Sequence, residues 1–154
     1  MNGVNIATMN VYAPCSNSEK FTLWRYIEQI KSNKNCTIWC VLRDFNSVRF
    51  ECERSGIRKE LTYKTKMDKF NDFIQNYELL DIPVVERKYT WYHPNGMAKS
   101  RIDRILVSEE WLQLWPDSKQ FIISRLVSDH CVIVVKNSVD WGQNHLEPLI
   151  CGNR

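Results

Sequence analysis

A set of polar residues stands out because their types and their order along the chain suit them to act together. The set comprises Tyr12, Asp44, Asn46, Asp103, Asp129 and His130. A carboxylate that holds one imidazole nitrogen fixes the tautomer of the ring and leaves the other nitrogen free to face a substrate. Asp103 and His130 are the expected pair of this kind, because an ionised carboxylate on an apolar strand needs a partner.

The strands that must position these residues are visible as short apolar segments. Segments 4–12 and 37–42 are predicted to be strands, and Tyr12 and Asp44 lie at their ends. Asp103 and the triplet 128–130 lie at the beginnings of later strands, predicted at 101–107 and 131–135. If the later strands run antiparallel to the earlier ones, all these positions gather on one rim. Alternation also places Asp103 on the same face as Ile105 and Val107.

The remaining segments predict a mixed fold. Apolar residues at helical spacing predict two helices, one through Phe21, Trp24, Ile27 and Ile30 after a cap at Ser16 or Ser18, the other through Met67, Phe70, Ile74 and Tyr77. Segment 49–66 is predicted to be a surface loop, 88–92 and 101–107 a hairpin, 109–114 a helical turn and 120–127 a strand. Strands outnumber helices and follow one another through short links, which favours an α+β sandwich over a doubly wound parallel sheet.

Composition limits the class of protein. The 154 residues, 44% of them hydrophobic, suit one globular domain, predicted at 1–138, and the segment 139–154 loses all periodicity. A formal charge of +3 permits a polyanionic partner without requiring one. The chain shows no secretory signal and no apolar run of the roughly 20 residues that span a bilayer. We therefore expect an intracellular protein of the nucleus or cytoplasm, with no membrane partner and with reduced cysteines.

Each candidate residue also has a simpler interpretation. Asp44 and Asn46 are common in ordinary turns, Asp129 suits a polar turn, and a single histidine such as His130 is often structural. Tyr12 alone suits packing at the rim of a sheet. The cysteines suggest zinc, but Cys36 and Cys40 lie on a predicted strand and no second pair follows at zinc-finger spacing.

The ordered combination of motifs resembles a known family. Asn10–Pro14, Asp44–Asn46 and Ser128–His130 are similar, in order and spacing, to the tyrosine-bearing strand end, the Gly-Asp-Phe-Asn turn and the terminal Ser-Asp-His motif of the endonuclease/exonuclease/phosphatase superfamily. Glu53 and Arg54, with segments 89–91 and 100–108, look like the version found in plant LINE-type (non-LTR) retrotransposon endonucleases. Asp140–Gly142 is similar to the segment that joins such an endonuclease to a reverse transcriptase.

The resemblance implies a fold, a reaction and a role for each residue. It implies two stacked mixed β-sheets with outer helices, a four-layer α/β sandwich, and Mg²⁺-dependent cleavage of phosphoesters, here DNA. Asp129 would ligate the metal, His130 would contact the scissile phosphate, and Asp103 would orient His130. Asp44 would position and deprotonate the attacking water. Asn46 and Tyr12 would hydrogen-bond the phosphate and the attacking group.

Two departures from the family pattern bear on activity. The family's amino-terminal strands, with an asparagine and the principal metal-binding glutamate, have no counterpart before Val4. The resemblance thus implies a domain incomplete at its amino terminus and impaired in metal binding, since Mg²⁺ is held by few protein carboxylates. Arg43 stands where the motif has glycine, so its side chain either crowds the site or points to solvent.

Three functions follow as hypotheses. The first is a DNA-nicking endonuclease domain of a retroelement, with a reverse transcriptase in the parent polyprotein. The second is a noncatalytic remnant with weak DNA binding. The third is a phosphatase of the same superfamily.

Overall fold

The computed structural model describes residues 4–32, 36–56, 62–125 and 127–137. The helical elements are α1 (Asn17–Ser32), α2 (Thr62–Asn76), α3 (Glu109–Leu114) and the 3₁₀ turn η1 (Glu51–Glu53). The strands are β1 (Ile6–Tyr12), β2 (Ile38–Asp44), β3 (Arg54–Ser55), β4 (Leu80–Asp81), β5 (Val84–Val85), β6 (Trp91–Tyr92), β7 (Lys99–Ser100), β8 (Asp103–Val107), β9 (Lys119–Ile123) and β10 (Val132–Lys136). The segment 139–154, predicted to be a separate tail, lies outside the described residues.

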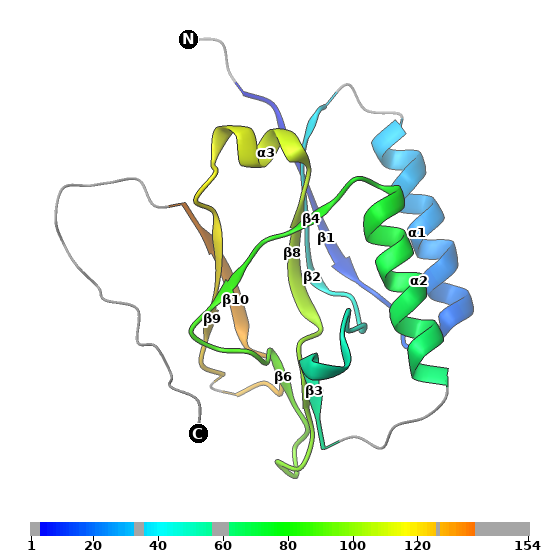
Figure 1. The fold of residues 1–154 in the computed structure, drawn as a ribbon, viewed down its shortest axis with the longest axis vertical. Helices are drawn as coiled ribbons and strands as arrows, with labels where there is room; N and C mark the ends of the chain where they lie inside the picture. Colours follow the sequence, from blue (N-terminus) through cyan, green and yellow to red (C-terminus); the bar gives the residue numbers. More distant parts are fainter. Residues whose placement is uncertain (1–3, 33–35, 57–61, 126, 138–154) are drawn as a thin grey trace, which may run out of the picture.

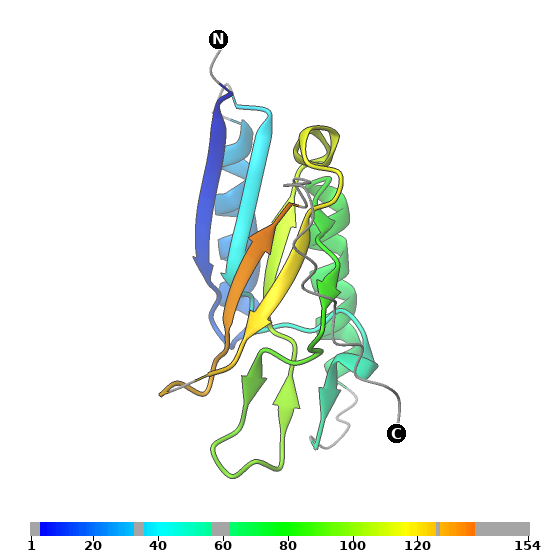
Figure 2. The ribbon, with the colours of Figure 1, turned by 90° about the vertical axis from the view of Figure 1, so that its left-hand side faces the viewer.

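Two mixed sheets are stacked in the way that the sequence predicts. The first has the order β1-β2-β8-β4, with β1 parallel to β2 and β8 antiparallel to both β2 and β4. The second has the order β10-β9-β5. Helices α1 and α2 lie on one side of the four-stranded sheet, and β9 and β10 lie on the other (Figures 1 and 2). The predicted α+β sandwich is confirmed.

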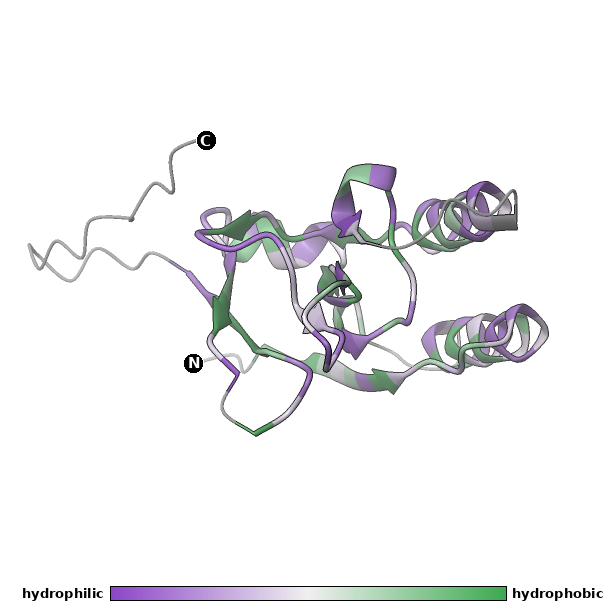
Figure 3. Cartoon of the chain, turned by 90° about the horizontal axis from the view of Figure 1, so that it is seen from below, coloured by the Kyte–Doolittle hydropathy of each residue, from purple (hydrophilic) through white to green (hydrophobic). Residues whose placement is uncertain are grey.

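Separate apolar clusters fill the two faces of the four-stranded sheet. Between this sheet and the helices, Trp24 stacks on Phe73 with ring centroids 4.1 Å apart, and Phe45 and Phe70 pack beside them. Seen end-on, α1 and α2 lie side by side along this flank (Figure 3). Between the sheets, a smaller cluster contains Cys40, Ile82, Ile105 and Val107. Residues 38–41 of β2 are therefore buried on both faces, as the continuous apolar sequence predicts.

The predicted hairpin between 88–92 and 101–107 is wrong. Strand β6 pairs instead with β7, and the chain then crosses to the four-stranded sheet, where β8 pairs with β2 and β4. The physical reason is that β8 is buried along its whole length, so it belongs between two partners. A two-stranded ribbon with β6 would leave part of this strand exposed.

Three smaller predictions also need correction. Segment 49–66 is not all loop, because it contains η1, β3 and the first turn of α2. Phe21 does not face the core and is 62% exposed, whereas Trp24 and Ile27 of the same helix are buried. The strand predicted at 120–127 ends at Ile123. The mixed charges of 49–66 suggested a solvated surface, but part of that charge is buried.

This buried charge forms a network that ties η1 and β4 to β8. The side chain of Arg104 is fully buried and donates to Glu53 and, at 2.6 Å, to Asp81. Arg101 donates to the same two carboxylates, at 3.3 Å to Glu53 and 3.0 Å to Asp81. Arg49 adds a contact of 3.3 Å to Asp81. Each carboxylate is therefore surrounded by guanidinium groups in a place with little water.

Arg43 has a backbone conformation that favours glycine, with φ +99°. The residue is exposed, so its side chain points to solvent. A non-glycine residue in this region carries backbone strain of about 1–3 kcal/mol. Substitution by glycine relieves this strain, but the greater conformational freedom of glycine in the unfolded chain offsets part of the stability gained.

We therefore expect Arg43→Gly to raise the free energy of unfolding by about 1 kcal/mol in urea titrations. Arg43→Ala is the matched control, because it removes the side chain but keeps the strain. An equal gain in both variants would contradict this explanation.

Candidate active site

Strand register brings Tyr12, Asp44 and Asp103 into one row at the edge of the four-stranded sheet. Tyr12 pairs with Asp44 across β1 and β2, and Asp44 pairs with Asp103 across β2 and β8. The two carboxylates are buried, whereas Tyr12 is 77% exposed. The ends of β1 and β2 and the beginning of β8 thus form one rim, which is the arrangement that antiparallel pairing predicts.

His130 lies over this rim between the two carboxylates. Its Nδ1 is 3.1 Å from Oδ1 and 3.0 Å from Oδ2 of Asp103. Its Nε2 is 4.0 Å from Oδ2 of Asp44. In the tautomer with its proton on Nδ1, the ring donates to the Asp103 carboxylate, and this contact orients Nε2 toward Asp44. The expected pairing of Asp103 with His130 is present.

Thr90, which sequence reasoning missed, holds both members of this pair in place. Its buried hydroxyl accepts hydrogen bonds from the N–H groups of Ile102 at 3.0 Å and Asp103 at 2.9 Å. Its carbonyl oxygen accepts one from the N–H of Cys131 at 2.7 Å. The side chain of Thr90 therefore positions the beginning of β8, and its backbone carbonyl positions the segment that carries His130.

The carboxylate of Asp129 contacts Trp91 and not the carboxylates of Asp44 and Asp103. The indole N–H of Trp91 donates to Asp129 Oδ2 at 2.8 Å, and the N–H of Tyr92 donates to the Asp129 carbonyl at 2.9 Å. The hydrogen bond from Trp91 is the main reason that the pKa of Asp129 lies below its usual value. The carboxylate is therefore ionised at neutral pH, as a metal ligand must be.

Asp44 and Asn46 form a tight turn at the end of β2. Asp44 Oδ1 accepts a hydrogen bond from the N–H of Asn46 at 2.8 Å, and the Asn46 side-chain amide donates to the Ala13 carbonyl at 2.6 Å and to Asp44 Oδ2 at 3.2 Å. Asn46 has φ +47°, a conformation that asparagine tolerates better than most residues. The turn joins the ends of β1 and β2.

Burial raises the pKa of Asp44, and the nearby charge of Asp103 adds to this effect. The hydrogen bond from Asn46 and the charges of His130 and Lys20 act in the opposite direction. A carboxylate with a raised pKa is a stronger base, which suits proton abstraction near neutral pH.

Lys20 is a second residue that sequence reasoning missed. It is 6% exposed, and its ammonium group donates to the Asn46 carbonyl at 2.5 Å and to Ser47 Oγ at 2.8 Å. Burial lowers its pKa to about 8. The available signal was its spacing of four and seven residues from Trp24 and Ile27, which places it on the buried face of α1.

The lowered pKa of Lys20 makes stability depend on pH. The unfolded lysine titrates near 10.5 and the folded one near 8, so between these values the unfolded state binds more protons. We expect the stability of the wild-type chain relative to Lys20→Met to rise with pH in this window, by at most about 1.4 kcal/mol per pH unit. Urea unfolding near the two ends of the window tests this, with Lys64→Met as the matched loss of a lysine. A pH-independent difference would exclude the burial effect.

The described residues contain no cluster of three metal-ligating side chains, no disulfide and no membrane-spanning helix. No three His, Cys, Asp or Glu side chains gather as a ready-made metal cage within the described residues. Cys36 and Cys40 are free thiols. None of the helices in the described ranges is long and apolar enough to cross a membrane.

Comparisons with known proteins identify the fold. No known family model and no curated sequence matches the chain. Among solved structures, the 3′-5′ exonuclease NExo from Neisseria meningitidis is similar with a TM-score of 0.64 and 18% identity, over 84% of this chain and 60% of that one. A NExo variant, described as a 3′ phosphatase bound to a product DNA hairpin, matches with a TM-score of 0.64 and 18% identity, over 88% of this chain and 62% of that one.

Two further structures share the arrangement. An endonuclease/exonuclease/phosphatase family protein from Leptotrichia buccalis has a TM-score of 0.55 and 18% identity, over 89% of this chain and 49% of that one. A mannosyl-6-phosphatase from Bacteroides thetaiotaomicron has a TM-score of 0.51 and 18% identity, over 88% of this chain and 52% of that one. The chain therefore spans about half to three fifths of these proteins. It has the fold of the endonuclease/exonuclease/phosphatase proteins.

Proposed function

We propose that the rim formed by Asp44, Asn46, Asp103 and His130 hydrolyses phosphodiester bonds in DNA with the help of Mg²⁺. The observation that carries this proposal is the position of His130, held by Asp103 through Nδ1 with Nε2 turned toward Asp44. Asp44 and His130 thus provide a base and a hydrogen-bond donor within a few ångströms of each other, which phosphoryl transfer requires.

Each residue of the rim then has a role that its surroundings support. Asp44, with its raised pKa, takes the proton from the attacking water. His130 donates from Nε2 to a phosphate oxygen when the ring is protonated, and Asp103 positions the ring. The exposed Tyr12 hydroxyl hydrogen-bonds the phosphate. Asn46, whose side-chain NH₂ already donates to Ala13 and Asp44, hydrogen-bonds the attacking water through its Oδ1.

Asp129 is the proposed metal ligand. Its ionised carboxylate offers hard oxygen atoms, the type that Mg²⁺ prefers, and Mg²⁺ commonly binds through one or two carboxylates with water completing the shell. A metal ion held by Asp129 would supply positive charge to balance the charge that develops on the phosphate oxygens. Trp91 holds the carboxylate in position.

We further propose that the domain is the endonuclease of a plant LINE-type retroelement, with a reverse transcriptase in the parent polyprotein. The support is the resemblance of Glu53, Arg54 and segment 100–108 to that version of the domain. Glu53 and segment 100–108 contribute to the buried charge network and to the rim, so the resemblance involves residues that shape the site.

A phosphatase is the second candidate, because similar folds include a protein described as a 3′ phosphatase and a mannosyl-6-phosphatase. The test compares nicking of supercoiled plasmid with phosphate release from a 3′-phosphorylated DNA hairpin and from a sugar phosphate, all with Mg²⁺. Nicking supports the proposed function, and release without nicking supports the phosphatase. DNA binding with neither reaction would identify a noncatalytic domain.

A further inference from the structure

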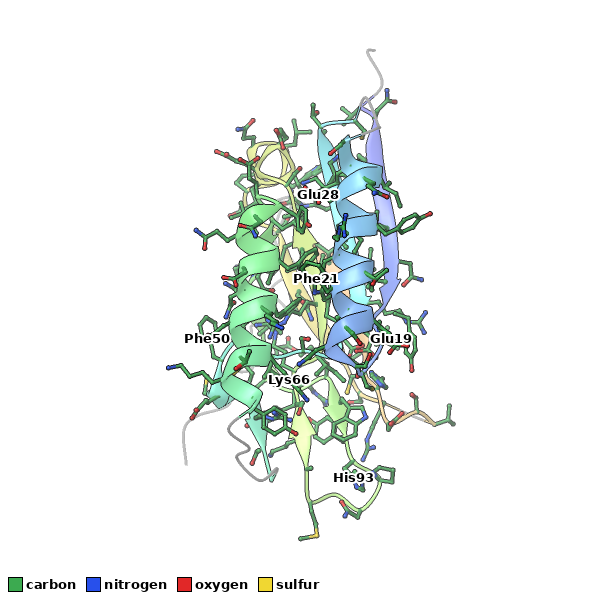
Figure 4. The ribbon with its side chains drawn as sticks, turned by 90° about the vertical axis from the view of Figure 1, so that its right-hand side faces the viewer. Glu19, Phe21, Glu28, Phe50, Lys66 and His93 are labelled. Atoms are coloured by element: carbon green, nitrogen blue, oxygen red, sulfur yellow. The ribbon has the colours of Figure 1, made fainter. Side chains whose placement is uncertain are left out.

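A groove runs between α1 and α2, on the flank away from the second sheet. Its volume is about 250 Å³, and its floor contains the aromatic rings of Trp24, Phe70 and Phe73. Figure 4 looks onto this flank and shows the two helices side by side, with Phe21 on α1 and Lys66 on α2 labelled. The groove is smaller than the roughly 300–1,000 Å³ of typical small-molecule pockets, so it suits part of a chain better than a compact ligand.

The charge of the groove is strongly positive. Lys20, Arg25, Lys66 and Lys69 line it, and Asp72 is the acidic residue among its lining. Lys20 is already engaged with Asn46 and Ser47. Within the described ranges, Arg25, Lys66 and Lys69 form no ion pair, and Lys66 Nζ lies 5.2 Å from the centre of the Tyr63 ring. These cations are therefore available to a negatively charged partner.

An exposed aromatic ring accompanies these cations. Phe21 is 62% exposed and lines the same groove, although an apolar ring on α1 would gain stability by facing the core. Single-stranded nucleic acids bind to surfaces that combine cations for the backbone with aromatic rings on which bases stack. Duplex DNA stacks its bases on one another and offers no free face to Phe21. An acidic peptide without apolar side chains would match the cations but not the ring.

We propose that the α1–α2 groove binds a single strand of nucleic acid, with phosphates at Arg25, Lys66 and Lys69 and a base stacked on Phe21. This surface is distinct from the catalytic rim and needs neither Mg²⁺ nor hydrolysis. Lys20 connects the groove to the rim, because it lines the groove and donates to the carbonyl of Asn46. A strand bound in the groove is thus separated from the Asp44–Asn46 turn by the side chain of Lys20.

The test measures binding of a fluorescent oligothymidylate of about ten nucleotides by anisotropy, in EDTA, with the His130→Ala chain as background. The double variant Lys66→Glu/Lys69→Glu is expected to weaken binding at least about tenfold and to reduce the slope of log K against log salt by about 1.4, or about 0.7 per lost phosphate contact. The double variant Lys64→Glu/Lys119→Glu changes the charge equally at exposed positions outside the groove, and it is expected to stay close to the parent.

Phe21→Ala separates stacking from charge. It is expected to weaken binding about tenfold with an unchanged salt slope, and to have no effect on an abasic oligonucleotide of the same length. Equal weakening by both double variants, or no binding by the parent chain, would overturn the proposal. Groove-dependent binding of polyglutamate or of anionic vesicles in place of the oligonucleotide would also overturn it. Because nothing is hydrolysed in this assay, its result is independent of whether the rim is catalytic.

Discussion

Asp44→Asn is expected to lower the rate of DNA cleavage by about two to four orders of magnitude, the usual contribution of a general base. The amide has nearly the same shape as the carboxylate, and its oxygen can still accept the shorter hydrogen bond, from the N–H of Asn46, while the longer one from the Asn46 side chain is lost. It cannot take a proton from water. The loss is therefore expected in kcat, with little change in KM for the plasmid.

The pH dependence of the cleavage rate is a more specific test of whether Asp44 is the base. Because burial raises the pKa of Asp44, the wild-type rate is expected to fall with acid at a pH above the usual range of an aspartate, and this acidic limb should be absent from the residual rate of Asp44→Asn. Asp117→Asn, at an exposed position before β9, is the matched control. A variant that keeps both its rate and its acidic limb would show that Asp44 is not the base.

Glu53→Gln is expected to lower the free energy of unfolding by about 3–5 kcal/mol, because it removes one of the two carboxylates that balance the buried guanidinium groups and leaves Asp81 as the other. Glu53 accepts from Arg101 and Arg104 and also from the N–H of Arg49 at 2.7 Å. Urea denaturation followed by tryptophan fluorescence measures the effect. Glu86→Gln, at an exposed position, is expected to stay within about 0.5 kcal/mol of the wild-type chain.

A second substitution tests whether charge balance is the cause. Glu53→Gln combined with Arg104→Met removes one charge of each sign, so the double variant should be more stable than the sum of the single effects predicts, by about 1–3 kcal/mol. Simple additivity would show that the contact between Glu53 and Arg104 contributes nothing to stability. Since Arg104 follows Asp103 directly on β8, these variants also report how firmly the network holds the rim.

The positions of the site residues could be predicted because they depend on strand ends. Apolar segments locate β1, β2 and β8, and one antiparallel pairing is enough to bring Asp44 next to Asp103. The pairing of Asp103 with His130 follows from the cost of an unpartnered buried carboxylate. The resemblance to a known family agreed with the same positions.

Other features could not be predicted, because their cause is nonlocal. Arg101, Arg104 and Glu53 have the same composition as a solvated surface, and their burial becomes visible only when η1 and β4 lie against β8. Strand β6 pairs with β7 and not with β8, and the local sequence pattern does not distinguish these two partners. Lys20 lies on the face of α1 that the spacing of Trp24 and Ile27 predicts to be apolar, and its role depends on its contact with the Asn46 carbonyl.

The central claim is that Asp44, His130 and Asp103 at the rim are catalytic. The most direct measurement compares nicking of supercoiled plasmid by the wild-type chain and by His130→Ala, with Mg²⁺ and with EDTA, after both are shown to be folded. The predicted result is nicking by the wild-type chain that requires Mg²⁺ and falls to background in His130→Ala. Equal nicking by both chains, or no nicking by the folded wild-type chain at any Mg²⁺ concentration, would contradict it.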